Sequence, residues 1–366
     1  MTLTNYWWLL IWLFLGGAIF GRMPKRRERL NGEIVERWDV FSAIMMVLPY
    51  IIWAGFRGDV SDTYSYRRTF LAISPELSQI PAFFINDTKD PGFSALMVLL
   101  KNIIGNQDKL FFLIIAIFQI GSLTLVFRKY SPNFWLSLFM FVVSTDYLSW
   151  VHNGMRQFIA VTIIFAGFGY VVKKQYIQMI ALILLASMIH GSALLMLPII
   201  FVVQGRVWNK GTILMLIATA GAVAFVDRFT PILNSLLQDT QYNDMIGNEI
   251  WAVDDGTNIL RVAFYSLPAV LSLLGLKYIQ ANDDRVMNIC VNYSIVTTAL
   301  YLVASVSSGV YIGRLPIYTT LPGYIAMPWM IDQIFEPRSA QLIRCGVCTL
   351  YMAFFYYQLH FAWGVL

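Results

Sequence analysis

Long apolar runs separated by short polar connectors dominate the hydropathy pattern of this chain. A transmembrane helix needs about 17–25 predominantly apolar residues, and twelve runs approach that length. The composition agrees, because the chain is only 13% charged and soluble proteins are nearer a quarter. The pattern predicts an all-α polytopic membrane protein that forms one transmembrane domain over residues 1–366. Its predicted spans are 3–21, 40–56, 110–127, 133–150, 156–172, 175–190, 191–205, 211–227, 260–277, 286–307, 315–332 and 343–362.

The basic residues gather in alternate connectors. Six connectors each hold at least two Lys or Arg, from the cluster within 22–37 to the pair Arg338 and Arg344. Because cytoplasmic loops are enriched in Lys and Arg, this face is predicted to be cytoplasmic and both termini to lie outside. The net charge of +5 follows from the same rule, so it does not indicate a nucleic-acid partner.

Two long connectors fall on the opposite, outer face, at residues 57–109 and 228–259. The first contains an apolar stretch, 92–106, that is short for a span. Counted as a span, it would invert everything before it relative to everything after it, and the basic connectors could no longer share one face. We therefore predict a re-entrant or interfacial helix at 92–106.

The segment that follows the second predicted span is rich in charge within a dozen residues. Arg57 is a candidate bidentate ligand for phosphate oxygens, and Asp62 is a candidate general base. Asp59, Tyr64 and Arg67 are candidate substrate-binding residues. The alternative is an interfacial loop whose charges neutralise one another in salt bridges.

A second motif, His152-Asn-Gly-Met-Arg156-Gln157, stands at the outer start of a predicted span. Arg156 and Gln157 would occupy its first helical turn. A helix N-terminus attracts anions, so a cation there is unfavourable unless an anion also binds. Arg156 is therefore predicted to bind a diphosphate, with His152 and Gln157 as candidate substrate contacts. A snorkelling arginine at the membrane interface is the alternative.

Two further outer positions carry candidate chemistry. His190 stands at the turn between two apolar helices, where a neutral imidazole could accept a proton from an attacking hydroxyl or could simply cap a helix. Ser192 follows it, but no GxSxG elbow supports a serine nucleophile. Arg314 precedes Pro316 at the mouth of the eleventh span, and we predict that it binds phosphate, with Tyr318 as a substrate contact.

These motifs occur in a characteristic order along the chain, and together they resemble the EpsG family of bacterial exopolysaccharide proteins, which is grouped with the Wzy-type polysaccharide polymerases. The resemblance covers roughly residues 50–330. Its motifs are Arg57…Asp62-Thr63-Tyr64, Asp90-Pro91-Gly92-Phe93, Asn153-Gly154-Met155-Arg156-Gln157-Phe158-Ile159-Ala160 and His190-Gly191-Ser192-Ala193.

The resemblance implies a glycosyltransferase with a GT-C-like fold in the bacterial plasma membrane. It would polymerise undecaprenyl-diphosphate-linked oligosaccharide repeat units into a surface polysaccharide, such as an O-antigen or capsule, on the outer (periplasmic) face. Arg57 and Arg156 would then bind the diphosphate. The flippase and the chain-length regulator of the same pathway would be its partners.

Two other functions remain open at this stage. A transporter or flippase of lipid-linked sugars would need a charged path through the midplane, and the predicted mid-span positions are largely uncharged. A membrane acyltransferase would need a donor site on the cytoplasmic face. No metal site is predicted among the matched motifs and no cofactor is expected, although the acidic loop 228–259 keeps a divalent cation possible.

Overall fold

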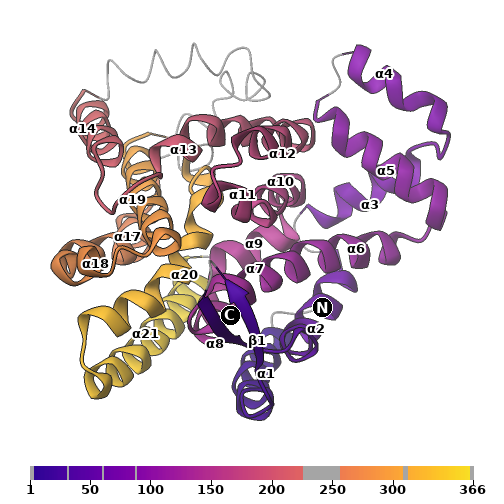
Figure 1. Ribbon diagram of the computed structural model, residues 1–366. Helices are drawn as coiled ribbons and strands as arrows, with labels where there is room; N and C mark the ends of the chain where they lie inside the picture. Colours follow the sequence, from indigo (N-terminus) through magenta and orange to yellow (C-terminus); the bar gives the residue numbers. More distant parts are fainter. Residues whose placement is uncertain are drawn as a thin grey trace.

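The computed structural model describes residues 4–30, 33–59, 62–86, 89–225, 256–307 and 312–362, and it is almost entirely helical (Figure 1). The N-terminal third contains α1 Thr4–Phe20, β1 Arg26–Leu30, β2 Glu33–Arg37, α2 Val40–Gly55, α3 Thr63–Ala72, η1 Leu77–Gln79, α4 Ile80–Ile85, α5 Pro91–Ile104, α6 Asp108–Ala116 and η2 Ile117–Gly121. The middle of the chain forms α7 Ser122–Tyr130, α8 Phe134–Val143, α9 Thr145–His152, α10 Met155–Ala166, α11 Phe168–Val172, α12 Tyr176–Ile189, η3 Gly191–Leu195, α13 Met196–Val202 and α14 Lys210–Ala224. The remainder is α17 Ile259–Leu274, α18 Leu276–Asn282, α19 Arg285–Ser305, η5 Ile312–Arg314, α20 Ile317–Ile334, α21 Pro337–Tyr357 and η6 Gln358–Ala362.

Fewer helices have the length of a straight span than the sequence predicts. Within the described residues, Asp108–Tyr130 and Arg285–Ser305 are long and apolar enough to cross a membrane. Two bent pairs could each make one more span: α8 with α9, bent by 66°, and α17 with α18, bent by 73°. The shorter apolar helices of the described residues, such as α2, α5 and α12, have 10–17 residues. The all-α membrane class is therefore supported, whereas the count of twelve spans stays a prediction.

Specific residues break the predicted spans. The bend between α8 and α9 falls at Ser144, whose extended backbone leaves the helix and whose hydroxyl lies 2.9 Å from that of Tyr265. The bend after α17 falls at Gly275, where a Cβ would come within 2.1 Å of Ile334. A larger residue there would force the Ile334 side chain to move, and hydropathy alone could not reveal this close packing.

The first basic connector forms an antiparallel hairpin that the sequence analysis did not predict. Strands β1 and β2 pair with Arg26 opposite Arg37 and Leu30 opposite Glu33. Arg128, at the end of α7, forms an ion pair with Glu28 and donates from Nε to the Trp38 carbonyl at 2.6 Å. The hairpin is thereby attached to the second basic connector.

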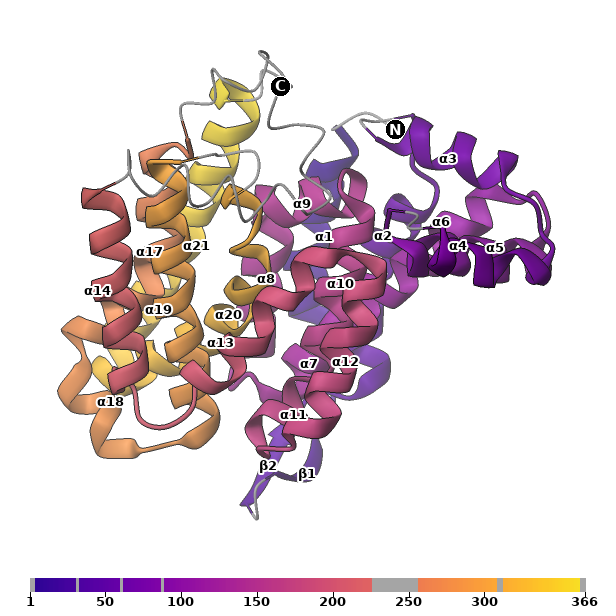
Figure 2. The same ribbon diagram turned by 90° about the horizontal axis from the view of Figure 1, so that it is seen from above.

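Contacts among the connectors place the basic ones at one end of the helices. Gln204 donates to the Val171 carbonyl, Arg206 pairs with Asp283, and Arg344 pairs with Asp332. Figure 2 shows the hairpin, α11 and α18 at this end, and α3, α9 and both ends of the chain at the other. The basic connectors therefore gather at one end of the helices, whereas the number of spans and their orientation in a membrane stay predictions.

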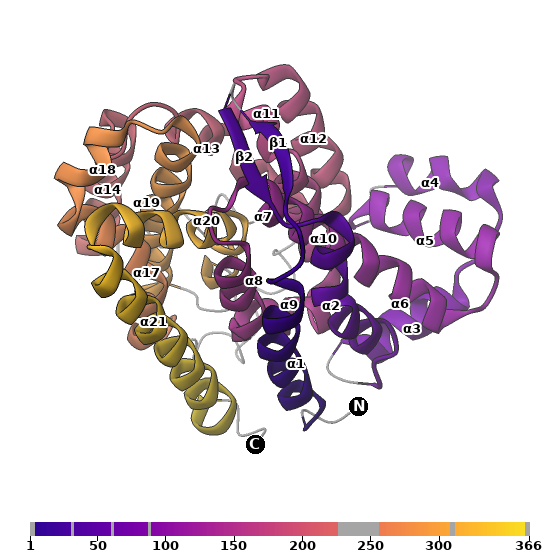
Figure 3. The same ribbon diagram turned by 60° about the horizontal axis from the view of Figure 1, so that its bottom comes forward.

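Residues 63–116 pack as a helical unit beside the main bundle, as Figures 1 and 3 show. The predicted helix at 92–106 forms as α5, which starts at Pro91 and ends before Gly105. It packs closely on α12, because a Cβ at Gly92 would lie 2.8 Å from Met188. The Lys101 ammonium donates to the carbonyls of Phe70 and Leu71, which ties α5 to the end of α3. Whether α5 enters the membrane stays a prediction.

Candidate active site

The turn after α12 is the meeting point of three separate elements. His190 ends α12, and its Nδ1 lies 2.7 Å from the Ser192 hydroxyl. The Tyr318 hydroxyl, from α20, is 3.0 Å from the same serine oxygen, and Gln157 of α10 donates to it at 3.3 Å. Three predicted site residues, His190, Gln157 and Tyr318, therefore surround Ser192, a residue that the sequence analysis had set aside.

Arg314 joins this cluster through its backbone. Its carbonyl accepts a hydrogen bond from Gln157 Nε2 at 3.4 Å. Its guanidinium lies over the Trp150 ring, 5.4 Å from the centroid. Within the part of the chain that the structure describes, no carboxylate pairs with it. Arg314 therefore brings positive charge that an anion could use.

Arg156 already has a carboxylate partner. Its Nη1 donates to Asp90 Oδ2 at 2.6 Å, and the Asp90 side chain is only 4% exposed. The same carboxylate accepts the backbone N–H of Gly191, beside His190. Asp90 adopts a left-handed backbone (φ 54°) as the N-cap of α5. Arg156 thus stands in the first turn of α10, as predicted, but its charge is compensated.

The charges around the turn act on two titratable groups. Burial, followed by the charges of Arg156, Arg314 and Lys89, lowers the pKa of His190 to about 3. Burial also raises the pKa of Asp90, and the Arg156 charge opposes that change. At neutral pH the imidazole is therefore uncharged and able to accept a proton, and the surrounding cations weaken it as a base until an anion compensates their charge.

Arg57 is buried against the turn between α9 and α10. It donates to the Val151 carbonyl, approaches Met155 Sδ at 3.7 Å, and lies 4.6 Å from the Phe112 centroid. It has no carboxylate partner among the described residues, and its contacts do not reach His190. Arg57 is therefore a second cation without a carboxylate partner among the described residues. It contacts Met155, the residue before Arg156, and lies outside the His190 cluster.

His152 lies beside Arg57 and is also buried. Its Nδ1 is 2.9 Å from the Leu148 carbonyl, and its ring packs against Trp53 with 4.7 Å between centroids. A carbonyl can only accept, so Nδ1 carries the proton and Nε2 has a free lone pair. In the described structure, Nε2 of His152 and Nε of Arg57 have no hydrogen-bond partner.

The remaining predicted residues lie on or before α3. Arg67 pairs with Asp59 and, from Nε at 2.6 Å, with Asp108. Asp59 and Arg67 therefore form the neutralising salt bridge that the sequence analysis gave as the alternative to substrate binding. Tyr64 is 59% exposed, and Asp62 is exposed at the start of α3. The substrate contact of Tyr64 and the role of Asp62 as a general base stay predictions.

Sequence analysis missed a buried ion pair. Arg261, in the first turn of α17, binds Asp146 Oδ2 through Nη2 at 2.8 Å and Nε at 3.1 Å. The Tyr301 hydroxyl donates to the same oxygen at 2.8 Å. Opposite charges inside two predicted spans, 133–150 and 260–277, were the available signal, because such residues in apolar runs are costly unless they are paired.

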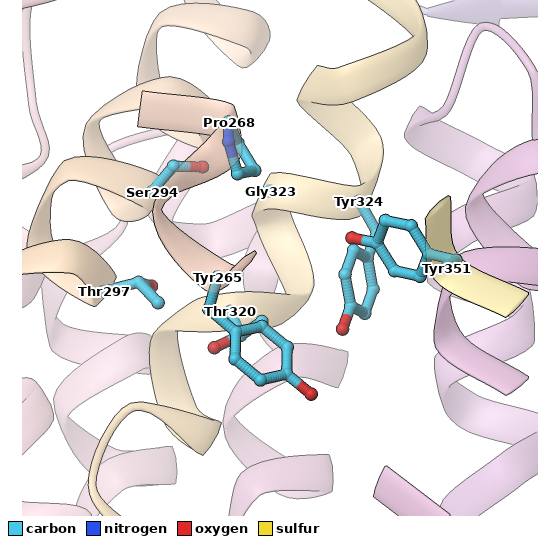
Figure 4. A pocket seen from close by; sticks show the side chains of 8 residues that line it. All are labelled: Tyr265, Pro268, Ser294, Thr297, Thr320, Gly323, Tyr324 and Tyr351. Atoms are coloured by element: carbon cyan, nitrogen blue, oxygen red, sulfur yellow. The ribbon is translucent and has the colours of Figure 1, made fainter. Parts of the chain in front are cut away.

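The pockets near this pair are too small for a sugar. The cavity in Figure 4, which Tyr265, Thr297, Thr320 and Tyr324 help to line, has a volume of about 10 Å³. That is room for roughly one water molecule. The neighbouring pocket around Asp146 is smaller still. Neither of these two pockets, both lined by described residues, holds a sugar as it stands, and the hydrogen bonds that Asp146 accepts from Arg261 and Tyr301 fit a structural role for the pair.

Replacing Arg261 with alanine should destabilise the protein by about 3–5 kcal/mol, because Asp146 would remain buried without its partner. The matched control is Arg344→Ala, which breaks the pair with Asp332, both of whose side chains are at least 32% exposed, and should cost at most about 1 kcal/mol. Unfolding in detergent, followed by the intrinsic tryptophan signal, measures both. Equal stability of the two variants would contradict the structural role of the buried pair.

No group of three or more His, Cys, Asp or Glu within the described ranges could hold a metal ion. Residues 228–255 of the acidic loop lie outside those ranges, so the possibility of a divalent cation there stays open.

Comparison with known proteins identifies one family. The model of the EpsG family matches residues 40–363, from the start of α2 to just beyond η6. No curated protein and no solved structure matches the chain. The matched range includes every motif quoted above and the whole cluster around Ser192. The chain belongs to the EpsG family.

Proposed function

We propose that this protein polymerises undecaprenyl-diphosphate-linked oligosaccharides on the outer face of the bacterial plasma membrane. The observation that carries the proposal is the cluster of His190, Ser192, Gln157, Tyr318 and Arg314. It lies at the end of the helices opposite the basic connectors. Membership of the EpsG family, a family of Wzy-type polymerases, supports a role in polysaccharide synthesis.

The proposed reaction joins two lipid-linked units. A hydroxyl oxygen of the acceptor bonds to the anomeric carbon of the donor, and the bond from that carbon to the diphosphate oxygen breaks. The leaving diphosphate gains negative charge as this happens. Arg314 and Arg156, held in place by Gln157 and Asp90, would stabilise that charge more in the transition state than in the ground state.

The proton of the acceptor hydroxyl needs a base. His190 is the first candidate, because it is neutral and hydrogen-bonded to the Ser192 hydroxyl. Asp62 is the second candidate. The mechanism is proposed to need no metal and no cofactor. The substrates arrive in the lipid bilayer, and a flippase and a chain-length regulator of the same pathway are the proposed protein partners.

The test is a reconstitution in liposomes with purified undecaprenyl-diphosphate-linked repeat units. We expect a ladder of polymer, one undecaprenyl diphosphate released for each bond formed, and the same ladder after treatment with a chelator. Movement of the labelled lipid across the bilayer without any ladder would refute the proposal and would favour a flippase. Transfer of an acyl group to the polysaccharide would favour the acyltransferase.

A further inference from the structure

Asp90 occupies an unusual place for a carboxylate. It lies beside the proposed diphosphate-binding Arg156, where it contacts both the cation of Arg156 and the N–H of Gly191. Its side chain is 4% exposed, so water screens its charge poorly. Its backbone is in the left-handed region (φ 54°) as the N-cap of α5. The carboxylate is therefore a fixed part of the site.

This arrangement conflicts with the binding of a second anion. Arg156 cannot fully compensate both the Asp90 carboxylate and a diphosphate. A unit charge about 6 Å away, at an effective dielectric constant of about 20, changes the proton affinity of a carboxyl group on the order of a hundredfold. Burial already acts in the same direction on Asp90. The diphosphate thus disfavours the ionised form of Asp90.

We propose that Asp90 takes up one proton from solution when a diphosphate binds Arg156. The inference rests on the proposed function. The Arg156 guanidinium exchanges its carboxylate partner for phosphate oxygens, and the neutral carboxyl group keeps its hydrogen bond from Gly191. Asp90 is then a positioning residue that holds Arg156 in place in the empty site and releases it to the substrate.

Other charged and titratable groups face the same site. They are Arg156 on α10, Lys89 beside Asp90, Tyr66 on α3, which hydrogen-bonds Arg156, Asp62 at the start of α3, and His190 and Arg314. Burial raises the pKa of Tyr66, so its hydroxyl is already protonated at neutral pH. His190 is a competitor for the proton, because a bound anion would raise its proton affinity too.

The experiment is calorimetric titration of the full-length protein with a short-chain polyprenyl-diphosphate sugar. Both phosphates of this probe are esterified and fully ionised, so the probe itself takes up no proton near neutral pH. Measuring the binding enthalpy in buffers of different ionisation enthalpy gives the number of protons taken up. We expect uptake approaching one proton near pH 6, falling as the pH rises towards 8.

Two variants assign the proton. Asp90→Asn should abolish the uptake and make the affinity independent of pH between about pH 6 and 8, with binding at pH 8 at least as tight as in the parent. His190→Gln should retain the uptake. Asp332→Asn, which alters an Asp–Arg pair at the opposite end of the helices, is the matched control and should behave as the parent.

The outcomes separate this inference from the proposed function. Binding of the probe without proton uptake overturns the role of Asp90 and leaves the diphosphate site standing. Uptake that survives Asp90→Asn and disappears in His190→Gln assigns the proton to His190 and also overturns the inference. If the parent protein does not bind the probe, the proposed function itself fails.

Discussion

Replacing His190 with alanine should slow glycosyl transfer by about 10²–10⁴-fold, the usual contribution of a positioned general base. Binding of the lipid-diphosphate donor should remain intact, because the imidazole faces the Ser192 hydroxyl and the cations of the site are separate groups. The measurement is turnover of the reconstituted protein with purified lipid-linked units, with donor binding determined independently.

The pH dependence of turnover is a second test of His190 as the base. In the free protein the pKa of His190 is lowered to about 3 by burial and by the neighbouring cations. Its basic form therefore dominates at every pH above about 4. A bound diphosphate compensates those cations and raises the pKa, so the acid limb of kcat should lie at higher pH than that of kcat/KM.

His360 provides the matched control. It lies in η6 and stacks on Tyr356 at 5.2 Å, remote in sequence from the turn after α12. His360→Ala should leave turnover unchanged. If His190→Ala retains turnover within about threefold of the parent, the proton goes elsewhere and Asp62 becomes the next candidate. If Asp62→Asn is equally active, catalysis rests on the arginines and on positioning alone.

Local signals in the sequence located several elements of the site. The start of α10 at Met155 follows from the glycine before it, which has a positive φ of 73°, and this start places Arg156 in the first turn. The turn at His190 follows from the glycine and serine between two apolar runs. These features depend on neighbouring residues, so a single sequence contains the information for them.

The partners of those residues could not be predicted in the same way. Ser192 and Tyr318 are 126 positions apart, and Asp90 and Arg156 are 66 positions apart. Hydropathy gives the existence of helices but not which faces meet. The absence of a GxSxG motif argued against Ser192 as a nucleophile, but it says nothing about a serine hydroxyl that connects three helices. Asp90 entered only as a motif residue, without a partner.

The hydropathy pattern also did not predict where the apolar runs are bent, because the bends depend on tertiary packing. Residues 133–150 form one apolar run, yet the structure bends there by 66°. The bend brings Asp146 and Trp150 to the end where Arg261 and Arg314 lie. Tertiary packing decides where an apolar run is interrupted, and mean hydropathy does not register a single serine or glycine at the break.

Replacing Arg156 with alanine should abolish polymer formation while the protein remains in the membrane. Two effects add. The lipid-diphosphate substrate loses a charged hydrogen-bonding partner, and such a partner is typically worth about 10²–10³-fold in rate. The Asp90 carboxylate, 4% exposed, is left without its cation and repels the diphosphate. Arg156→Lys should also fail, because an ammonium is a point charge that cannot replace a bidentate guanidinium. Arg68→Ala, an exposed arginine on α3, is the control and should give a normal ladder.

A double variant separates the two effects of Arg156. If this arginine only neutralises Asp90, then Arg156→Ala combined with Asp90→Asn removes the need for it and restores the ladder. If Arg156 also binds the diphosphate, the neutral amide removes the repulsion but supplies no cation, so the double variant regains binding only in part and turnover stays at least about 10²-fold below that of the parent. We expect the second result. A polymer ladder of normal length from Arg156→Ala alone, with membrane levels equal to those of the parent, would exclude Arg156 from the diphosphate site and leave Arg314 and Arg57 as its cations.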